Sequence, residues 1–245
     1  MRFDAPLIPA TLVRRYKRFL ADVTLEDGRT LTVHCANPGR MDGCAEPGSP
    51  VLLSDSRNPR RKLRYTWELT RTPTTWVGVN TQRTNAIARE GIESGVVAEL
   101  AGYPVVRAEV RFGAASRVDL LLEGAGPPCL VEVKNVTLAE AGCALFPDAV
   151  TRRGRTHLEE LARRAAAGDR AVMLYVVNRE DCHRFAPAAH IDPAYAEAFA
   201  RAVAGGVEVL VYAARVRPEG ITLARRISEI RTPARLGATR RPRGA

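Results

Sequence analysis

The stretch RVDLLL at residues 117–122 and the stretch LVEVKN at residues 130–135 are two short apolar segments, each interrupted by charge. A charged side chain is almost never fully buried unless it has a partner or binds an ion. The segment GAGPP at residues 124–128 lies between them and is typical of a hairpin turn. The two stretches therefore predict an antiparallel strand pair that carries a candidate site.

The register of this pair decides whether its charges meet. A hairpin centred between residues 125 and 126 places Asp119 directly opposite Glu132, and Lys134 shares a face with Glu132 because the two differ by two positions. Like charges opposite each other destabilise a sheet, but a bound cation reverses that effect. A one-residue slip would put the two carboxylates on opposite faces.

Two carboxylates and an ammonium group at one point suit metal-assisted hydrolysis of a phosphodiester. Carboxylate oxygens are ligands for Mg²⁺ or Mn²⁺, and the metal polarises a phosphate and lowers the pKa of a bound water. Lys134 then orients that water or offsets charge in the transition state. The alternative is a plain salt bridge between Glu132 and Lys134 on an edge strand, and the spacing alone leaves both interpretations open.

The residues around the pair predict an α/β domain after residue 80, because strands there alternate with helices. Helices are expected at 81–94, at 156–167 and at 193–203, and further strands at 105–112, 171–177 and 207–216.

The first 80 residues show a different pattern, in which short β-like runs are separated by turn residues. This pattern predicts a small closed or partly closed β-barrel, because closure removes exposed strand edges. The runs are 7–13, 19–25, 30–34, 51–54, 63–70 and 76–79.

The net charge of +10 favours a polyanionic partner, and its distribution is uneven. Residues 1–80 carry 13 Lys and Arg against 8 Asp and Glu, residues 81–230 carry 19 of each, and the tail 231–245 adds five Arg without an acid. No apolar run approaches the ~20 residues of a membrane helix and no secretory signal is recognised, so we expect no membrane association and a cytoplasmic protein. The five cysteines form no Cys-x-x-Cys pair, which argues against a disulfide framework or a zinc ribbon.

Two basic regions are candidate nucleic-acid contacts. In the barrel, basic residues interleave with aromatics that either stack bases or face the barrel core. Before the helix expected at 156–167, Arg152, Arg153 and Arg155 are candidates to hold phosphates at the helix N-terminus, and Thr156 or Gly154 to cap it. His157 is a candidate contact to the scissile phosphate, or a histidine on a helix surface. The barrel candidates are Arg57, Arg60, Arg61, Lys62, Arg64, Tyr65 and Trp67.

The arrangement of Asp119, Glu132 and Lys134 resembles the PD-(D/E)xK nuclease superfamily. Nearly the whole chain resembles the sugar fermentation stimulation protein A (SfsA) family, on the stretches NPGRM at 37–41, WVGVNT at 76–81, RVD at 117–119, VEVKNVT at 131–137 and FPDAVTRRGRTHL at 146–158. Val118 stands where the superfamily name has Pro, and Thr156 where a Lys is expected beside His157.

This resemblance implies an N-terminal OB-like β-barrel (1–80), a PD-(D/E)xK nuclease-like α/β domain (81–230) and DNA binding, with a basic tail at 231–245. It also suggests Glu99 as a third metal-binding carboxylate, the alternative being a solvated helix charge.

Three hypotheses follow. The first is a metal-dependent nuclease that binds DNA largely without sequence preference, with RNA left open. The second is a non-catalytic DNA-binding regulatory factor, as in regulators of sugar metabolism. The third is a purely structural or interaction module. An intact Asp119, Glu132 and Lys134 set favours the first, because an inactive core has no physical need to keep like charges adjacent.

Overall fold

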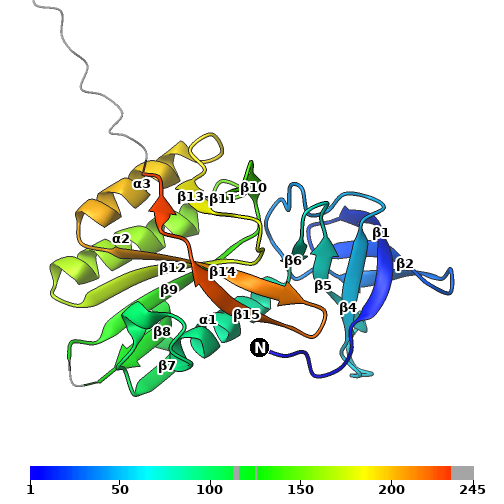
Figure 1. Cartoon of the computed structure of the whole chain (residues 1–245), viewed down its shortest axis with the longest axis horizontal. Helices are drawn as coiled ribbons and strands as arrows, with labels where there is room; N and C mark the ends of the chain where they lie inside the picture. The colour runs from blue at the N-terminus through cyan, green and yellow to red at the C-terminus, as the bar shows by residue number, and fades with distance from the viewer. Residues whose placement is uncertain (113–115, 125, 233–245) are drawn as a thin grey trace, which may run out of the picture.

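A computed structural model describes residues 1–112, 116–124 and 126–232 and has two lobes, a β-barrel and an α/β domain (Figure 1). The predicted two-domain α/β fold with an N-terminal barrel is confirmed.

The barrel consists of five strands that close on themselves. Their order is β3-β2-β1-β4-β5, and His34 of β3 pairs with Thr66 of β5 to complete the closure. A sixth strand, β6, extends the sheet beyond β5. The expected strands are all present, with these bounds: β1 Ile8–Tyr16, β2 Leu20–Leu25, β3 Thr30–His34, β4 Pro50–Asp55, β5 Tyr65–Arg71 and β6 Trp76–Gly78.

The α/β domain is built on a six-stranded sheet in the order β15-β14-β12-β9-β8-β7. Strands β9, β12 and β14 run parallel, and the hairpin partners at both edges run antiparallel. The elements are η1 Thr81–Arg83, α1 Thr84–Glu93, η2 Ala98–Leu100, β7 Val105–Phe112, β8 Ser116–Glu123, β9 Cys129–Val136, α2 Arg152–Ala166, β12 Arg170–Val177, α3 Pro193–Ala204, β14 Glu208–Arg217 and β15 Gly220–Arg226.

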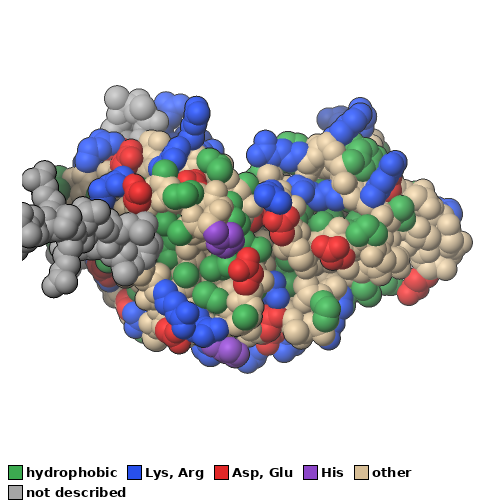
Figure 2. Space-filling model, turned by 90° about the horizontal axis from the view of Figure 1, so that it is seen from above, with side chains coloured by type: hydrophobic (Ala, Val, Ile, Leu, Met, Phe, Trp, Pro, Cys, Tyr) green, Lys and Arg blue, Asp and Glu red, His purple; other side chains and the backbone are tan. Residues whose placement is uncertain are grey.

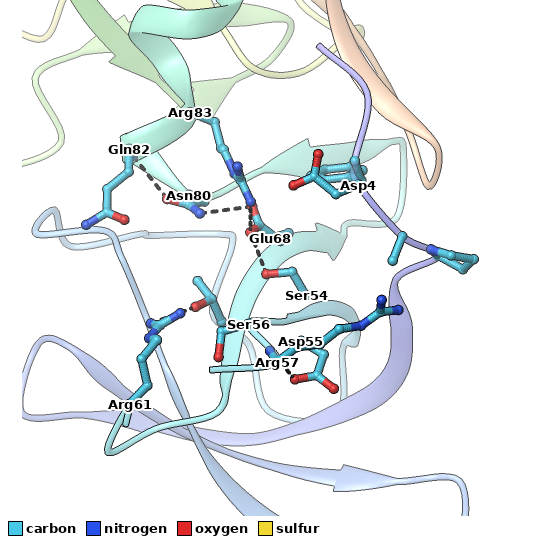
Figure 3. A pocket seen from close by; sticks show the side chains of 14 residues that line it. Asp4, Ser54, Asp55, Ser56, Arg57, Arg61, Glu68, Asn80, Gln82 and Arg83 are labelled. Carbon is cyan, nitrogen blue, oxygen red and sulfur yellow. Dashed lines mark hydrogen bonds and ion pairs between the residues drawn. The ribbon is translucent and has the colours of Figure 1, made fainter. Parts of the chain in front are cut away.

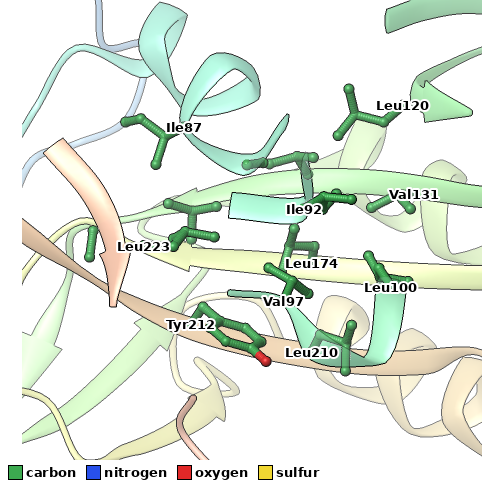
Figure 4. Close-up of a cluster of buried hydrophobic side chains, with 14 of the residues drawn as sticks. Ile87, Ile92, Val97, Leu100, Leu120, Val131, Leu174, Leu210, Tyr212 and Leu223 are labelled. Atoms are coloured by element: carbon green, nitrogen blue, oxygen red, sulfur yellow. The ribbon is translucent and has the colours of Figure 1, made fainter. Parts of the chain in front are cut away.

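Helices cover both faces of this sheet, and each face has its own core. Alternate residues of β9 divide between them, so Val131 and Val133 pack beneath α1 while Leu130 and Val136 pack beneath α2 and α3. Figure 4 shows the core beneath α1, where Ile87 and Ile92 of the helix meet the aliphatic side chains of the sheet. Glu132 and Lys134 alternate with the valines and so belong to the α2 side.

Two features depart from the sequence-based prediction. Helix α2 begins at Arg152, four residues earlier than expected, because Thr151 is its N-cap and accepts a hydrogen bond from the Gly154 amide at 3.0 Å. Strand β15 and a small second sheet of four short strands were not predicted. That sheet contains β10 Ala139–Glu140, β11 Cys143–Phe146, β13 Arg184–Pro187 and β16 Glu229–Ile230.

The two lobes are firmly joined. Leu52 and Leu69 of the barrel belong to the hydrophobic core beneath α1, and the Gly78 amide donates to the Asn178 carbonyl at 2.9 Å. Residues 1–7 precede β1 and reach across to the α/β domain, where the Met1 amino group pairs with Glu90 at 2.5 Å. The barrel is therefore held in a fixed position relative to the sheet.

One polar contact of this junction is centred on Asp181. The Arg179 guanidinium, which is 9% exposed, holds the Asp181 carboxylate through two hydrogen bonds of 2.6 and 2.7 Å, and the Thr74 hydroxyl donates to it from the barrel. Partial burial acts to raise the pKa of Asp181, but the hydrogen bonds from Arg179 and Thr74 outweigh it and lower the pKa to about 2.

In the described residues, no helix is both long and apolar enough to cross a membrane.

We expect Asp181→Asn to lower the free energy of unfolding at pH 7 by about 1 kcal/mol after allowance for solvent screening. Because the folded-state pKa is depressed, this stabilisation is present above pH ~4 and is lost as pH falls towards 2. Urea unfolding of the unmodified protein and of Asp181→Asn, from pH 7 down to pH 2, measures the difference in their free energies of unfolding. Asp42→Asn, which removes an exposed ion pair with Arg40, is the matched control, and a difference that does not narrow below pH 4 contradicts the assignment.

Candidate functional site

The strand register predicted for the charged pair is the one that the structure has. Strand β8 pairs with β9 antiparallel through Leu120 with Val131, Leu121 with Leu130 and Leu122 with Cys129. Asp119 and Glu132 occupy the next position of that register, just beyond the last paired residues. Leu121 and Leu130 lie two positions from Asp119 and Glu132 respectively, and so on the same face of their strands. Both leucines belong to the core beneath α2 and α3, so the two carboxylates start from that face.

Asp119 lies where the two strands begin to separate, and its carboxylate spans the gap. Its Oδ2 accepts a hydrogen bond from the Val133 amide at 2.8 Å, and its Oδ1 accepts one from the Asn85 side chain at 3.1 Å. Asn85 lies in the first turn of α1. The Asp119 carboxylate is thus fixed from both the neighbouring strand and a helix.

Glu132 is 5% exposed and lies at the centre of the cluster. Its Oε1 accepts a hydrogen bond from Lys134 Nζ at 2.5 Å and contacts His157 Nδ1 of α2. Within the described residues, no hydrogen bond is made to its Oε2. One oxygen is therefore neutralised by the protein, and the other is left for a further partner.

The neighbours of His157 determine where its proton lies. Arg153 Nε donates to His157 Nε2 at 3.2 Å, and a guanidinium is only a donor, so Nε2 acts as the acceptor. In the neutral ring the proton is then on Nδ1, which donates it to Glu132, and Lys134 Nζ, 3.1 Å from the same nitrogen, donates to Glu132 rather than to the ring. Lys134 and His157 accordingly both donate to the same carboxylate oxygen.

The two carboxylates are perturbed in opposite directions. Burial, reinforced by the negative charge of Glu132, raises the pKa of Asp119. Burial also acts to raise the pKa of Glu132, but the hydrogen bond from His157 and the charge of Lys134 together lower it. A cation between the two would relieve the repulsion that Asp119 experiences.

The expectation that Glu99 completes a set of three carboxylates is wrong. Its carboxylate accepts a hydrogen bond from the Tyr212 hydroxyl at 2.6 Å and pairs with Arg226 at 2.7 Å. Tyr212 and Arg226 lie on β14 and β15, near the edge of the sheet opposite to β8. The Glu99 carboxylate therefore makes a structural contact there and does not reach Asp119 and Glu132.

The residues that are present fit a metal that keeps part of its hydration shell. No group of three or more His, Cys, Asp or Glu side chains in the described ranges is arranged to enclose a metal ion. Mg²⁺ does not need such a cage, because it commonly binds through one or two carboxylates, several waters and a substrate phosphate. Asp119 and the Oε2 atom of Glu132 supply donors of this kind.

The structure brings one of the predicted arginines of α2 to this cluster, because Arg153 contacts His157. Arg152, Arg153 and Arg155 all lie in the first turn of the helix, which carries no acidic residue there. Positive side chains at a helix N-terminus oppose the helix dipole and favour binding of an anion at that end. Arg155 Nη1 lies 3.7 Å from Asp192, and Arg152 is exposed.

The basic residues of the barrel lie on the loop between β4 and β5. Arg57, Arg60, Arg61 and Lys62 are exposed and remain candidate phosphate contacts, and Arg64 is exposed but pairs with Asp55 at 2.6 Å. Tyr65 is half-buried with the Arg64 guanidinium over its ring at 5.3 Å.

Of the two interpretations of Trp67, base stacking is wrong and a position in the barrel core is correct. Its side chain is 0% exposed, and its Nε1 donates to the Leu69 carbonyl at 2.9 Å inside the barrel core. The Trp67 side chain therefore packs inside the barrel and is not available on the barrel surface.

A polar pocket of about 480 Å³ lies beside this loop (Figure 3). Its floor is Glu68, which is 1% exposed and accepts hydrogen bonds from Ser54 at 2.7 Å, Asn80 at 2.9 Å and Arg83 at 3.0 Å. These partners satisfy both carboxylate oxygens, and Glu68 thereby links the barrel to the start of the α/β domain. Arg57 and Arg61 line the same pocket.

Several residues of the site carry no signal in the sequence. Asn85, which fixes Asp119, lies 34 positions before it, and Asp192, which accepts a hydrogen bond from the Thr151 amide, lies 41 positions after that threonine. Such contacts depend on tertiary packing, which no local pattern reports.

A closed five-stranded barrel followed by an α/β domain defines a two-domain protein with an N-terminal OB barrel. Residues 13–79 match the family model described as the SfsA N-terminal OB domain, and residues 82–220 match the sugar fermentation stimulation protein RE domain.

Relatives of known family are similar in sequence to this chain over almost its full length. The sugar fermentation stimulation protein homolog of Geotalea uraniireducens is 54% identical over 93% of this chain and 99% of its own, and that of Geobacter sulfurreducens is 57% identical over 93% and 97%. A solved structure of Pyrococcus furiosus SfsA in complex with Ca²⁺ is similar with a TM-score of 0.86 and 26% identity, over 94% of this chain and 98% of that one. The chain belongs to the sugar fermentation stimulation protein family.

We expect Asp119→Asn and Glu132→Gln each to weaken binding of Mn²⁺ at least tenfold, because each removes a charged ligand of the candidate site. Glu99→Gln is the matched control and is expected to bind Mn²⁺ as the unmodified protein does. Isothermal titration calorimetry measures the dissociation constant of Mn²⁺ for all three variants. Equal weakening by Glu99→Gln, or none by Asp119→Asn and Glu132→Gln, contradicts the site.

Proposed function

We propose that the protein is a divalent-metal-dependent nuclease that cleaves phosphodiester bonds of nucleic acid bound by its barrel and by the start of α2. The observation that carries this proposal is the cluster in which the buried Glu132 meets the partly buried Asp119, Lys134 and His157.

Each residue has a part in this chemistry. Asp119 and Glu132 would hold Mg²⁺ or Mn²⁺, which polarises a phosphate and lowers the pKa of a bound water. Lys134, 2.5 Å from Glu132 Oε1, places a positive charge beside the phosphate, where negative charge develops as the bond breaks. Arg153 fixes the proton of His157 on Nδ1 and so keeps the ring directed at Glu132.

The affinity for nucleic acid is assigned to positive groups outside this cluster. Residues 81–230 carry no net charge, whereas residues 1–80 carry +5. Figure 2 shows Lys and Arg side chains on both lobes, along the hollow between them. Most of the tail, 233–245, lies outside the described residues, and its arginines are expected to contribute in the same non-specific way.

The solved relative supports the choice of metal. The structure of Pyrococcus furiosus SfsA is described as a complex with Ca²⁺, an ion that takes the same oxygen ligands as Mg²⁺. We infer that this chain also takes a divalent cation, at Asp119 and Glu132.

One observation favours the non-catalytic alternative, a DNA-binding regulatory protein. Lys134 and His157 already neutralise Glu132 without any metal, so the cluster is also stable as a purely structural ion pair. A direct cleavage assay separates the two hypotheses: labelled single- and double-stranded DNA and RNA are incubated with the protein and Mg²⁺, Mn²⁺ or EDTA.

We expect Glu132→Gln and Lys134→Ala each to lower the cleavage rate about 100-fold or more, while the dissociation constant for DNA changes less than about threefold. The site serves the reaction, and the affinity resides elsewhere. Cleavage of end-labelled DNA in Mn²⁺ and fluorescence anisotropy binding in EDTA measure the two quantities. Full activity in either variant, or parallel loss of binding and cleavage, contradicts the assignment.

We expect deletion of 231–245, or neutralisation of Arg60, Arg61 and Lys62 together, to weaken binding to unrelated duplexes equally. Each lost phosphate contact flattens the log–log salt dependence by about 0.9 for duplex DNA. Binding is measured from low to moderate salt for each protein. Unchanged affinity and slope would mean that these residues are only solvated surface.

A further inference from the structure

A cavity of about 250 Å³ lies where the barrel meets the α/β domain. One wall is the turn 37–39 of the barrel. The second is 135–138, the end of β9 and the two residues after it, and the third is the segment 145–151 that leads into α2. Neither domain forms this cavity alone.

The lining of the cavity suits a flat ring with polar edges. Pro38, Leu138, Phe146 and Val150 give it apolar walls, and polar groups lie at intervals between them. Its volume is below the roughly 300–1,000 Å³ of pockets that take drug-sized ligands, so it holds a single ring system. A nucleobase has this form, with apolar faces and hydrogen-bonding edges.

Part of the cavity wall is open to solvent. Val150, in that wall, is 67% exposed and offers an apolar surface to a ligand. Thr137, which also lines the cavity, is 4% exposed, and its carbonyl accepts a hydrogen bond from Arg179 at 2.9 Å.

The cavity adjoins the candidate nuclease site. Val136, in its wall, follows Lys134 by two residues on β9, and Thr151 caps the helix that carries His157. It lies at the carboxyl end of a parallel strand, the edge of α/β sheets where ligands bind. Arg18, from the turn between β1 and β2, lines it on the barrel side and donates to the Pro38 carbonyl at 2.9 Å.

The walls of the cavity are held in place before any ligand arrives. The Arg15 guanidinium donates to the carbonyls of Asn37, Gly39 and Arg40 at 2.8–3.1 Å and so fixes the barrel turn. Gly39 lies against the Asp148 carboxylate, and a Cβ at this position would clash with it. The cavity therefore does not require a large rearrangement to form.

We propose that this cavity takes the base of one unpaired nucleotide beside the bond that is cut. The inference rests on the proposed nuclease function and specifies its substrate: a single strand, or a duplex end that has opened, rather than an intact duplex. A base cannot remain paired in a duplex and also enter the cavity. Asp148, which only accepts hydrogen bonds when ionised, favours a base that presents an amino group.

The test uses full-length Glu132→Gln protein in EDTA, so that binding is observed without cleavage. The probes are single-stranded 15-nucleotide DNAs, each with one 2-aminopurine at a successive position, and the same DNAs fully paired. The fluorescence of 2-aminopurine rises when the base leaves the stack. We expect a several-fold rise at one position of the single strand and none in the paired DNA.

A substitution that fills the cavity tests the location. Ala149 lines the cavity and is half-buried, and Ala149→Leu in the same Glu132→Gln background is expected to abolish the rise. Ala204→Leu, at the exposed end of α3, is the matched control and is expected to keep it. Circular dichroism and anisotropy confirm that both variants fold and bind DNA.

The outcomes separate this inference from the proposed function. A rise that Ala149→Leu abolishes supports the cavity even if the unmodified protein cleaves nothing in Mn²⁺, a result that would overturn only the nuclease proposal. Absence of any rise, or a rise that survives Ala149→Leu, overturns the cavity proposal. Cleavage of intact duplex at the rate of single strand also overturns it while leaving the nuclease proposal in place.

Discussion

The burial of one carboxylate, Glu132, constrains the rest of the structure. An ionised carboxylate that is 5% exposed must be paired, and its partners come from its own strand and from α2. Helix α2 must therefore pack against β9 with His157 facing the sheet, and the strand must carry Lys134 two residues beyond Glu132. Asp119 then has to lie beside this group, because Val133 offers its amide only where the two strands separate.

Strand β9 also connects this site to the domain junction. Its last residues contact the segment that follows β12: the Val136 carbonyl accepts from the Asn178 amide, and the Thr137 carbonyl accepts from Arg179 at 2.9 Å. Arg179 in turn holds Asp181, which the barrel contacts through Thr74. Site and junction thus share one continuous backbone, and a displacement of the barrel would be transmitted to the residues that follow Lys134.

The sequence predicted the parts of this structure that local chemistry determines. Alternation of apolar residues located the barrel strands and the central strands of the sheet, and the hairpin at 124–128 gave the register of Asp119 and Glu132. The failures were at contacts between distant segments. Glu99 has a partner, Arg226, that no local pattern could reveal. For Trp67 the sequence left two orientations open, and barrel closure selects the one that faces the core. The start of α2 was misplaced because arginines occupy a first turn that usually favours acidic residues.

The close approach of Gly39 to Asp148 limits the sequence changes that the junction can accept. A Cβ at position 39 would overlap the Asp148 carboxylate, so a larger residue there would force the barrel turn and the segment before α2 apart. Insertions would therefore be tolerated in the exposed turn between β2 and β3 but not at this junction.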